Sequence, residues 1–135
     1  MFFVVKRATL LMASGPANDI GRKHLFICVT DAVGAAKETL IVPIQSHRAN
    51  ITNDGACVLH VGDHPFIKHK SVVSYRDAKI VEEAKLMNGV KAGLFVPREA
   101  IDTAVFARVC YGLEQSQFVA PKFLAFYNAS RGIQP

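Results

Sequence analysis

The amino-acid sequence predicts an α+β domain, in which a small, strongly bent antiparallel sheet or SH3-like barrel is followed by one long C-terminal helix. The N-terminal part holds four or five short apolar segments that turn-forming residues separate. The clearest helical periodicity comes after them, over residues 97–115. Strands that come first, and do not alternate with helices, are typical of α+β folds. The 135 residues are expected to form a single domain, 1–135.

The strand signal comes from β-branched and large apolar side chains. It predicts strands over residues 2–12, 24–30, 38–44 and 56–61, with a fifth candidate over 75–81. The residues between them include a Gly- and Pro-containing loop at 14–21, a turn around Gly34, and loops at 50–55 and 62–70. Pro43 has no backbone N–H, so it indicates an edge position or a strand end for the third segment.

The helix is expected to run from Pro97 to Gln115. Proline suits the first turn of a helix, and Glu99 and Asp102 lie near the positive end of its dipole. An apolar stripe at helical spacing predicts the face that packs on the core: Ile101, Val105, Val109 and Leu113. A shorter helical stretch is expected over 82–87, an extended segment broken by Pro121 over 118–127, and a mobile tail over 128–135.

The charge balance favours an anionic partner. Sixteen Lys and Arg against eleven Asp and Glu give a formal net charge of +5, and the pI is about 9.3. Three widely spaced cysteines predict free thiols, as in a reducing cytoplasm. The apolar N-terminus is broken by Lys6 and Arg7, which favours a strand over a signal peptide. No apolar run is long enough to span a membrane.

The densest group of chemically active side chains lies between Cys57 and His69. Three of the five His residues fall there, beside Asp63, and all five lie between His24 and His69. Imidazoles can bind metal, move protons or contact phosphate. Three interpretations remain open: a metal site, a rigid turn in which Asp63 accepts backbone N–H groups while His64 or His69 pairs with Tyr75, or RNA contact and catalysis by His64 and His69.

Three further groups suit nucleic-acid chemistry, although each also fits an ordinary polar loop or a core position. Arg22, Lys23 and His24 stand at the entry of a predicted strand, where they suit phosphate contact. The group Ser46, His47 and Arg48 combines a hydroxyl, an imidazole and a guanidinium, which RNA cleavage through the 2′-hydroxyl requires. Tyr75 and Arg76 suit base stacking and phosphate binding.

Two of the predicted strands resemble those of the PemK/MazF-like growth-inhibitor toxins. Residues 22–29, RKHLFICV, are similar to the family's second strand, in which a basic pair and a proline precede a strand of the kind RPVLVLS. Residues 40–46, LIVPIQS, resemble the next strand, which typically has the sequence VVPITS. More strands and then a helix follow in a similar order, so that the resemblance covers residues 20–115.

The resemblance implies an SH3-like barrel with an added helix, usually a homodimer, that cleaves single-stranded RNA without a metal and is neutralised by a small antitoxin. By position, the family's arginine falls at Lys23, beside Arg22, its threonine at Gln45 and its serine at Ser46. Lysine lacks the planar fork of arginine, and Gln45 cannot replace a hydroxyl. Either Arg22 and Ser46 take these roles, or the activity is lost. Residues 62–69, GDHPFIKH, have no counterpart in the family pattern.

The leading hypothesis is a divergent toxin-like endoribonuclease or RNA-binding protein that acts on single-stranded RNA in the cytoplasm without a cofactor. His47 is the expected acid or base with Ser46 beside it, and His64 and His69 are second candidates. The positive charge that binds the phosphate is expected from Arg22, Lys23 and Arg48. The alternatives are a non-catalytic nucleic-acid or protein-binding module of the same fold, and a metal-dependent hydrolase built on the His60–His69 cluster. The catalytic proposal requires the loops at 14–21, 45–55 and 62–70 to meet.

Overall fold

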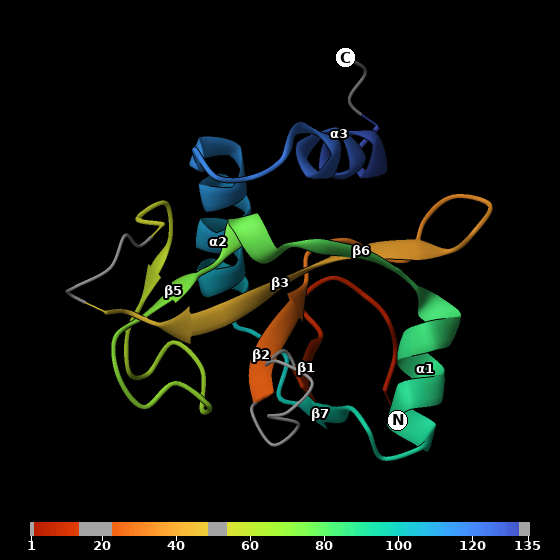
Figure 1. Cartoon of the computed structure of the whole chain (residues 1–135), viewed down its shortest axis with the longest axis horizontal. Helices are drawn as coiled ribbons and strands as arrows, with labels where there is room; N and C mark the ends of the chain where they lie inside the picture. The colour runs from red at the N-terminus through yellow and green to blue at the C-terminus, as the bar shows by residue number, and fades with distance from the viewer. Residues whose placement is uncertain (1, 14–22, 49–53, 133–135) are drawn as a thin grey trace.

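The α+β class is confirmed by a computed structural model, which describes residues 2–13, 23–48 and 54–132 (Figure 1). Within these ranges the strands are β1 (Thr9–Ala13), β2 (Lys23–Cys28), β3 (Glu38–Ser46), β4 (Val58–Leu59), β5 (Ser71–Val73), β6 (Lys79–Glu82) and β7 (Val96–Arg98). The helices are α1 (Glu83–Lys91), α2 (Thr103–Gln115) and α3 (Pro121–Ser130), with a short 3₁₀ helix, η1, at Tyr75–Asp77.

All seven strands form one antiparallel sheet that is organised around β3. The strand order is β4-β5-β3-β2-β1-β7, and β6 pairs with the first half of β3 on the side where β5 pairs with its second half. No ladder joins β4 to β7 within the described ranges, so the sheet is open and the expected barrel is not confirmed. Both the predicted turn around Gly34 and the strands at 24–30 and 38–44 are present, with small shifts of their ends.

Pro43 lies in the middle of the sheet, contrary to the edge position that its missing N–H favoured. It stands opposite Phe26 of β2, and its carbonyl accepts a hydrogen bond from the Ser74 N–H (2.8 Å) on the other side of β3. The N and O atoms of a strand residue face the same side. The absent N–H therefore faces the position where the partner of β3 changes from β6 to β5, and a proline is tolerated there.

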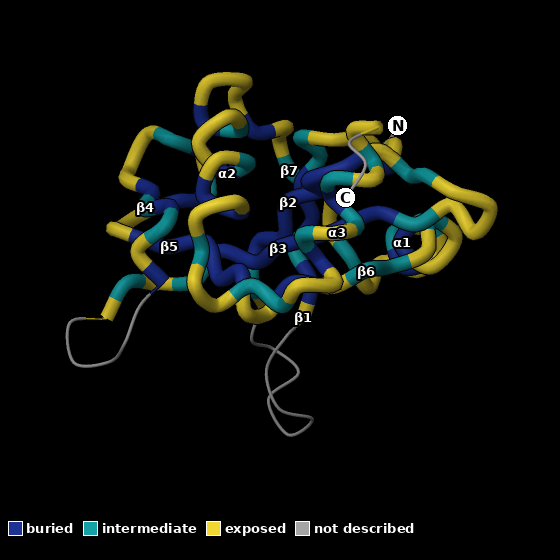
Figure 2. Tube along the Cα trace, turned by 90° about the horizontal axis from the view of Figure 1, so that it is seen from above, coloured by how far each residue is buried: buried dark blue, intermediate teal, exposed yellow. Residues whose placement is uncertain are grey.

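The sheet is buried on both faces, as the dark blue central strands in Figure 2 show. Leu25 and Ile27 of β2 belong to the larger core, together with Val109 of α2 and Phe123 of α3. The alternate residue Phe26 packs on the opposite face with side chains of β1 and α1. A strand with two buried faces has a continuous apolar sequence. This explains why residues 24–30 carry no polar alternation.

Three predicted strands have different bounds. The first begins only at Thr9, because Lys6 and Arg7 form a turn in which Arg7 has a φ of 79°. The side chain of Arg7 is fixed there by donating to the Ile101 carbonyl (2.8 Å). The predicted strand at 56–61 contains only β4. The candidate at 75–81 is divided between η1 and β6, while β5 was not predicted.

The helix that was predicted over 97–115 is present as α2, which is shorter. α2 begins at Thr103 and not at Pro97, because Asp102 caps it by accepting from the Ala104 N–H (3.0 Å), and Pro97 lies in β7 opposite Leu10. The predicted apolar stripe of this helix is buried, which confirms its role in the core.

Residues 121–130 form α3, where an extended segment and the start of a mobile tail were expected, because Pro121 occupies the first turn instead of breaking the segment. The expected tail continues after α3 with a described turn at 131–132. Its last residues, 133–135, lie outside the described residues, as do the expected loop at 14–21 and part of that at 50–55. In the described part of the chain, none of the helices combines the length and apolarity that a membrane crossing needs.

Candidate functional site: a basic pocket beside the central strand

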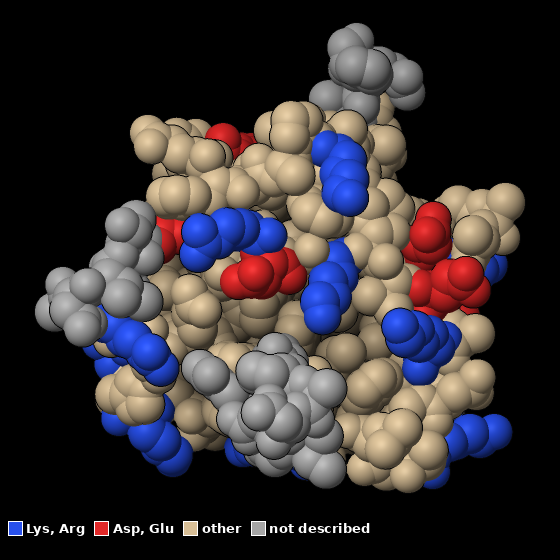
Figure 3. All heavy atoms as spheres, in the orientation of Figure 1, with Lys and Arg blue, Asp and Glu red and all other residues tan. Residues whose placement is uncertain are grey.

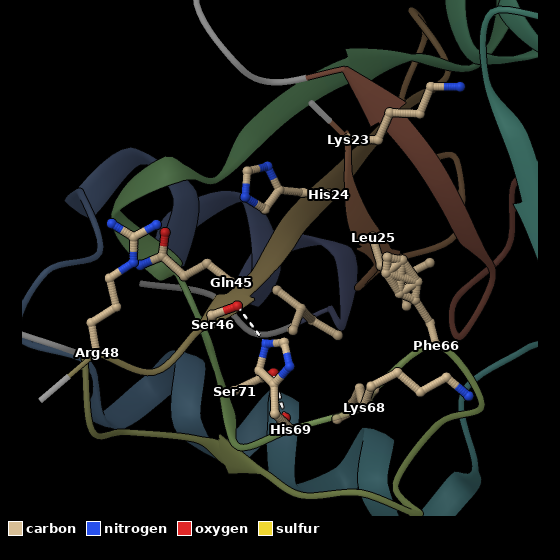
Figure 4. A pocket seen from close by; sticks show the side chains of 12 residues that line it. Lys23, His24, Leu25, Gln45, Ser46, Arg48, Phe66, Lys68, His69 and Ser71 are labelled. Atoms are coloured by element: carbon tan, nitrogen blue, oxygen red, sulfur yellow. Dashed lines mark hydrogen bonds between the residues drawn. The ribbon is translucent and has the colours of Figure 1, made fainter. Parts of the chain in front are cut away.

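A pocket of about 540 Å³ lies where the start of β2, the end of β3 and the loop before β5 converge (Figure 4). We call it the basic pocket, and we call residues 60–70 the pocket loop. The residues that line the pocket are Lys23, His24, Leu25, Ile44, Gln45, Ser46, Arg48, Phe66, Ile67, Lys68, His69 and Ser71. It thus contains side chains from segments far apart in the sequence.

Antiparallel pairing explains this convergence. The start of β2 lies beside the end of β3, because Leu25 stands opposite Ile44. The end of β3 in turn lies beside the start of β5, because Ser46 stands opposite Ser71. The His47 N–H extends this pairing by donating to the Lys70 carbonyl (3.1 Å). The described parts of the 45–55 and 62–70 loops therefore meet at the pocket. The 14–21 loop, the third that the catalytic hypothesis required, lies outside the described residues.

The lining is positively charged and also contains apolar side chains. Lys23, Arg48 and Lys68 supply three cations, His24 and His69 supply two imidazoles, and none of the lining residues is Asp or Glu. Space-filling atoms in the same orientation as Figure 1 show basic and no acidic side chains at the lower left, over the loop between β4 and β5 (Figure 3). Apolar side chains of both strands and of the pocket loop complete the lining: Leu25, Ile44, Phe66 and Ile67.

Ser46 and His69 form a close polar pair in the pocket. Ser46 Oγ lies 2.6 Å from His69 Nε2, and Figure 4 shows the imidazole pointing toward the hydroxyl. The backbone of His69 is fixed as well, because the Ser71 hydroxyl donates to its carbonyl (2.9 Å). A hydroxyl within hydrogen-bond reach of an imidazole is an arrangement that can transfer a proton.

His64 has a different environment, although it belongs to the same loop. Its side chain is buried, Nε2 lies 2.6 Å from the Glu99 carbonyl oxygen, and Nδ1 accepts a hydrogen bond from the Phe66 N–H (3.0 Å). His64 does not line the basic pocket. Its predicted place as a second catalytic candidate is therefore not supported by its position.

The rigid-turn interpretation of this segment is correct for Asp63 and wrong for Tyr75. Asp63 Oδ2 accepts from the His60 N–H (2.8 Å) and lies 3.4 Å from Arg108 Nη1. Tyr75 pairs with neither His64 nor His69, because it is fully buried and donates its hydroxyl to the Val109 carbonyl (2.7 Å). Burial also raises the pKa of Tyr75. The predicted base-stacking role of Tyr75 is therefore wrong.

The side chains of the His60–His69 cluster are dispersed. His60 is exposed, His64 is buried and contacts the Glu99 carbonyl, and His69 faces the basic pocket. Cys57 is buried, and its burial raises the pKa of the thiol. Over the described ranges, no three His, Cys, Asp or Glu side chains come close enough together to hold a metal ion. The metal-dependent hydrolase is consequently not supported by geometry.

The other predicted site residues divide into three groups. Lys23, His24 and Arg48 line the basic pocket with Ser46 and His69, whereas His47 does not. Arg76 is exposed above the Phe118 ring, with its guanidinium carbon 5.8 Å from the ring centroid, and it lies outside the pocket lining. Arg22 falls outside the described residues.

Sequence reasoning missed Phe66, Lys68 and Ser71 as pocket residues. Lys68 follows an apolar pair and precedes His69, and this combination of a basic and an imidazole side chain was the available signal. The three cysteines, Cys28, Cys57 and Cys110, are free thiols, as predicted. Cys28 and Cys57 are buried, and burial raises the pKa of Cys28 to about 12.

Comparison of the chain with protein-family models, with curated proteins and with solved structures gives no match in any of the three searches.

Proposed function

We propose that the basic pocket binds the phosphodiester backbone of single-stranded RNA and cleaves it without a metal. The observation that carries this proposal is the lining itself: three cations and two imidazoles surround a hollow to which no carboxylate contributes. Such a lining favours phosphate and disfavours cationic or metal-bound ligands.

The cleavage chemistry uses His69 and His24 as acid and base. One imidazole removes the proton of the ribose 2′-hydroxyl, whose oxygen attacks the adjacent phosphorus. The bond to the 5′-oxygen breaks, and the second imidazole donates a proton to this leaving oxygen. The products are a 2′,3′-cyclic phosphate and a free 5′-hydroxyl. Lys23, Arg48 and Lys68 stabilise the charge that develops on the phosphorane oxygens.

Unpaired RNA fits this pocket better than a duplex. Bases of a single strand can be splayed away from their neighbours and placed against apolar or aromatic side chains. Phe66 and Ile67 of the pocket loop and Leu25 and Ile44 of the sheet provide such a surface next to the cations. A base inside a duplex is stacked and cannot enter a hollow of this size.

The resemblance to the PemK/MazF-like toxins is a second support. The three described positions that it identified, Lys23, Gln45 and Ser46, lie together in the pocket lining. On this ground we also propose the family's other properties for this chain: an SH3-like arrangement of the strands, a homodimer, and a small antitoxin that covers the pocket. The substitution of the family's threonine by Gln45 removes a hydroxyl, and Ser46 with His69 takes over its place in the chemistry.

The test is the cleavage of a long unstructured RNA by the purified protein, with and without EDTA. Cleavage should persist in EDTA and should fall by about 10²-fold or more in His69→Ala, because an acid–base group contributes that much. His60→Ala is the matched control, since His60 lies on the same loop, is exposed and does not line the pocket.

Three outcomes would contradict the proposal in different ways. Loss of cleavage in EDTA would contradict the metal-free mechanism. Loss in His47→Ala with full activity in His69→Ala would return the acid–base role to His47. RNA binding without cleavage in any condition would leave a binding module.

A further inference from the structure

The basic pocket is attached to β7 by a brace, which we define as the contacts of His64 and Phe66 with Arg98 and Glu99. His64 Nε2 lies 2.6 Å from the Glu99 carbonyl oxygen. The guanidinium carbon of Arg98 lies 5.5 Å from the centroid of the Phe66 ring, a distance at which a cation is attracted to an aromatic face. Two residues of the pocket loop, one on each side of Pro65, are thus held by the last residue of β7 and the residue after it.

The hydrogen bonds of His64 determine its tautomer. The Phe66 N–H can only donate, so Nδ1 accepts and carries no proton. The carbonyl of Glu99 can only accept, so Nε2 carries the proton and donates it. His64 is therefore a neutral imidazole with both nitrogens in use. Its burial keeps water from competing for either bond.

The brace is continuous with the pocket lining, because Phe66 belongs to both. The His64 carbonyl also accepts from the Ile67 N–H (2.9 Å), so the turn at 64–67 is closed from within. Residues 66–69, which begin within this turn, all line the pocket, including His69 with its bond to Ser46. A displacement of the turn changes the place of the His69 ring relative to β3.

We propose that His64 is a positioning residue for the basic pocket: its bond to Glu99, the residue after β7, sets the place from which His69 reaches Ser46 and the substrate. This inference rests on the proposed RNA cleavage for its kinetic consequence. His64 touches no substrate, and two of the three cations, Lys23 and Arg48, lie on other segments of the chain. Its loss therefore lowers kcat and leaves KM nearly unchanged.

The experiment compares His64→Asn with His64→Gln. The Asn side-chain oxygen can accept from the Phe66 N–H as the Nδ1 atom does, but its amide is too short to reach the Glu99 carbonyl. The Gln amide extends to the position of Nε2 and can donate to Glu99. The first variant keeps the acceptor for the Phe66 N–H and removes the bond to Glu99, and the second keeps the bond to Glu99.

In His64→Asn we expect kcat to fall about tenfold and KM to change less than about twofold, since a displaced catalytic group costs rate and not affinity. In His64→Gln we expect kcat to return to within about threefold of the unmodified protein. Equal kcat values in the Asn variant and the unmodified protein, with both folded, would overturn the inference. A rise in KM in place of the fall in kcat would overturn it too.

A measurement without RNA separates this inference from the proposed function. The ¹⁵N and ¹H signals of the His69 ring report its bond to Ser46 by NMR. They should move in His64→Asn and stay close to those of the unmodified protein in His64→Gln. Unchanged His69 signals in His64→Asn would overturn the positioning role. If the unmodified protein cleaves no RNA but these shifts are seen, the proposed function fails and the positioning of His69 by the brace stands.

Discussion

His64 and His69 lie five positions apart in the pocket loop and have opposite surroundings. Both nitrogens of His64 contact backbone groups inside the protein, whereas His69 is exposed and directs Nε2 to the hydroxyl of Ser46. One imidazole therefore holds the loop in place, and the other is available to a ligand. The difference shows that a cluster of His in a sequence does not by itself identify a site, because the turn between the residues decides which of them reaches the surface.

The largest expected difference between the two imidazoles is their reactivity. Diethyl pyrocarbonate acylates exposed imidazoles, and we expect His69 to react on the order of 10² times faster than His64, since His64 must first open locally. Mass spectrometry of the modified peptides measures both rates in the same sample. Similar rates at the two positions would show that the turn at 64–67 opens readily, which would break the distinction.

The second difference is in stability. His64→Ala leaves the Phe66 N–H and a lone pair of the Glu99 carbonyl without a partner, so we expect the free energy of unfolding to fall by about 1–3 kcal/mol. His69→Ala is the matched control and should change it by less than about 0.5 kcal/mol, as is usual for an exposed position. Urea denaturation with a shared m-value gives both numbers. A larger loss in His69→Ala would reverse the assignment of the two residues.

A third test concerns the positive charge that Lys68 of the pocket loop contributes to the pocket lining. Lys68→Ala should weaken RNA binding several-fold and reduce the slope of log K against log[salt] by about 1, because one phosphate contact is lost. Lys85→Ala on α1 changes the net charge equally but lies outside the pocket lining, so its slope should stay that of the unmodified protein. Equal effects in the two variants would indicate attraction by net charge alone.

The smallest effect on stability is expected at Asp63, the residue before His64 in the pocket loop. Its contact with Arg108 is 3.4 Å long and partly exposed, and such pairs contribute little. Asp63→Asn retains an acceptor for the His60 N–H, so the free energy of unfolding should change by about 0.5 kcal/mol or less. A thermal denaturation at low and high salt measures it. A loss well above that value would mean that Arg108 holds the loop as strongly as His64 does.

The fold was predicted well where local pattern decides the outcome. The continuous apolar segments gave β2 and β3, and the 3.6-residue spacing of Val105 and Val109 gave the buried face of α2. α3 was missed because Pro121 was taken as a break in an extended segment, although Phe123 and Tyr127, four residues apart, are both buried by helical spacing. A proline at the start of a segment fits either structure, and only packing against the core distinguishes them.

The site could be predicted only in part, for a similar reason. Lys23, Ser46 and Arg48 were identified because they stand beside strand ends, and they do line the pocket. The choice between His47 and His69 depends on the pairing of β3 with β5, which places Ser46 opposite Ser71 and so brings His69 to its hydroxyl. A contact over that separation in the chain leaves no periodic trace in the sequence.

The Glu99 carbonyl has a second donor, which connects the pocket to the start of the chain. Thr9 of β1 donates its hydroxyl to the same oxygen (2.8 Å) that His64 contacts. β1 and the pocket loop therefore share one acceptor in the residue that follows β7, and we expect the amide protons of these segments to exchange with solvent through a common opening. Because this junction closes contacts between distant parts of the chain, the pocket is completed late in folding, after helices such as α2 have formed from local contacts.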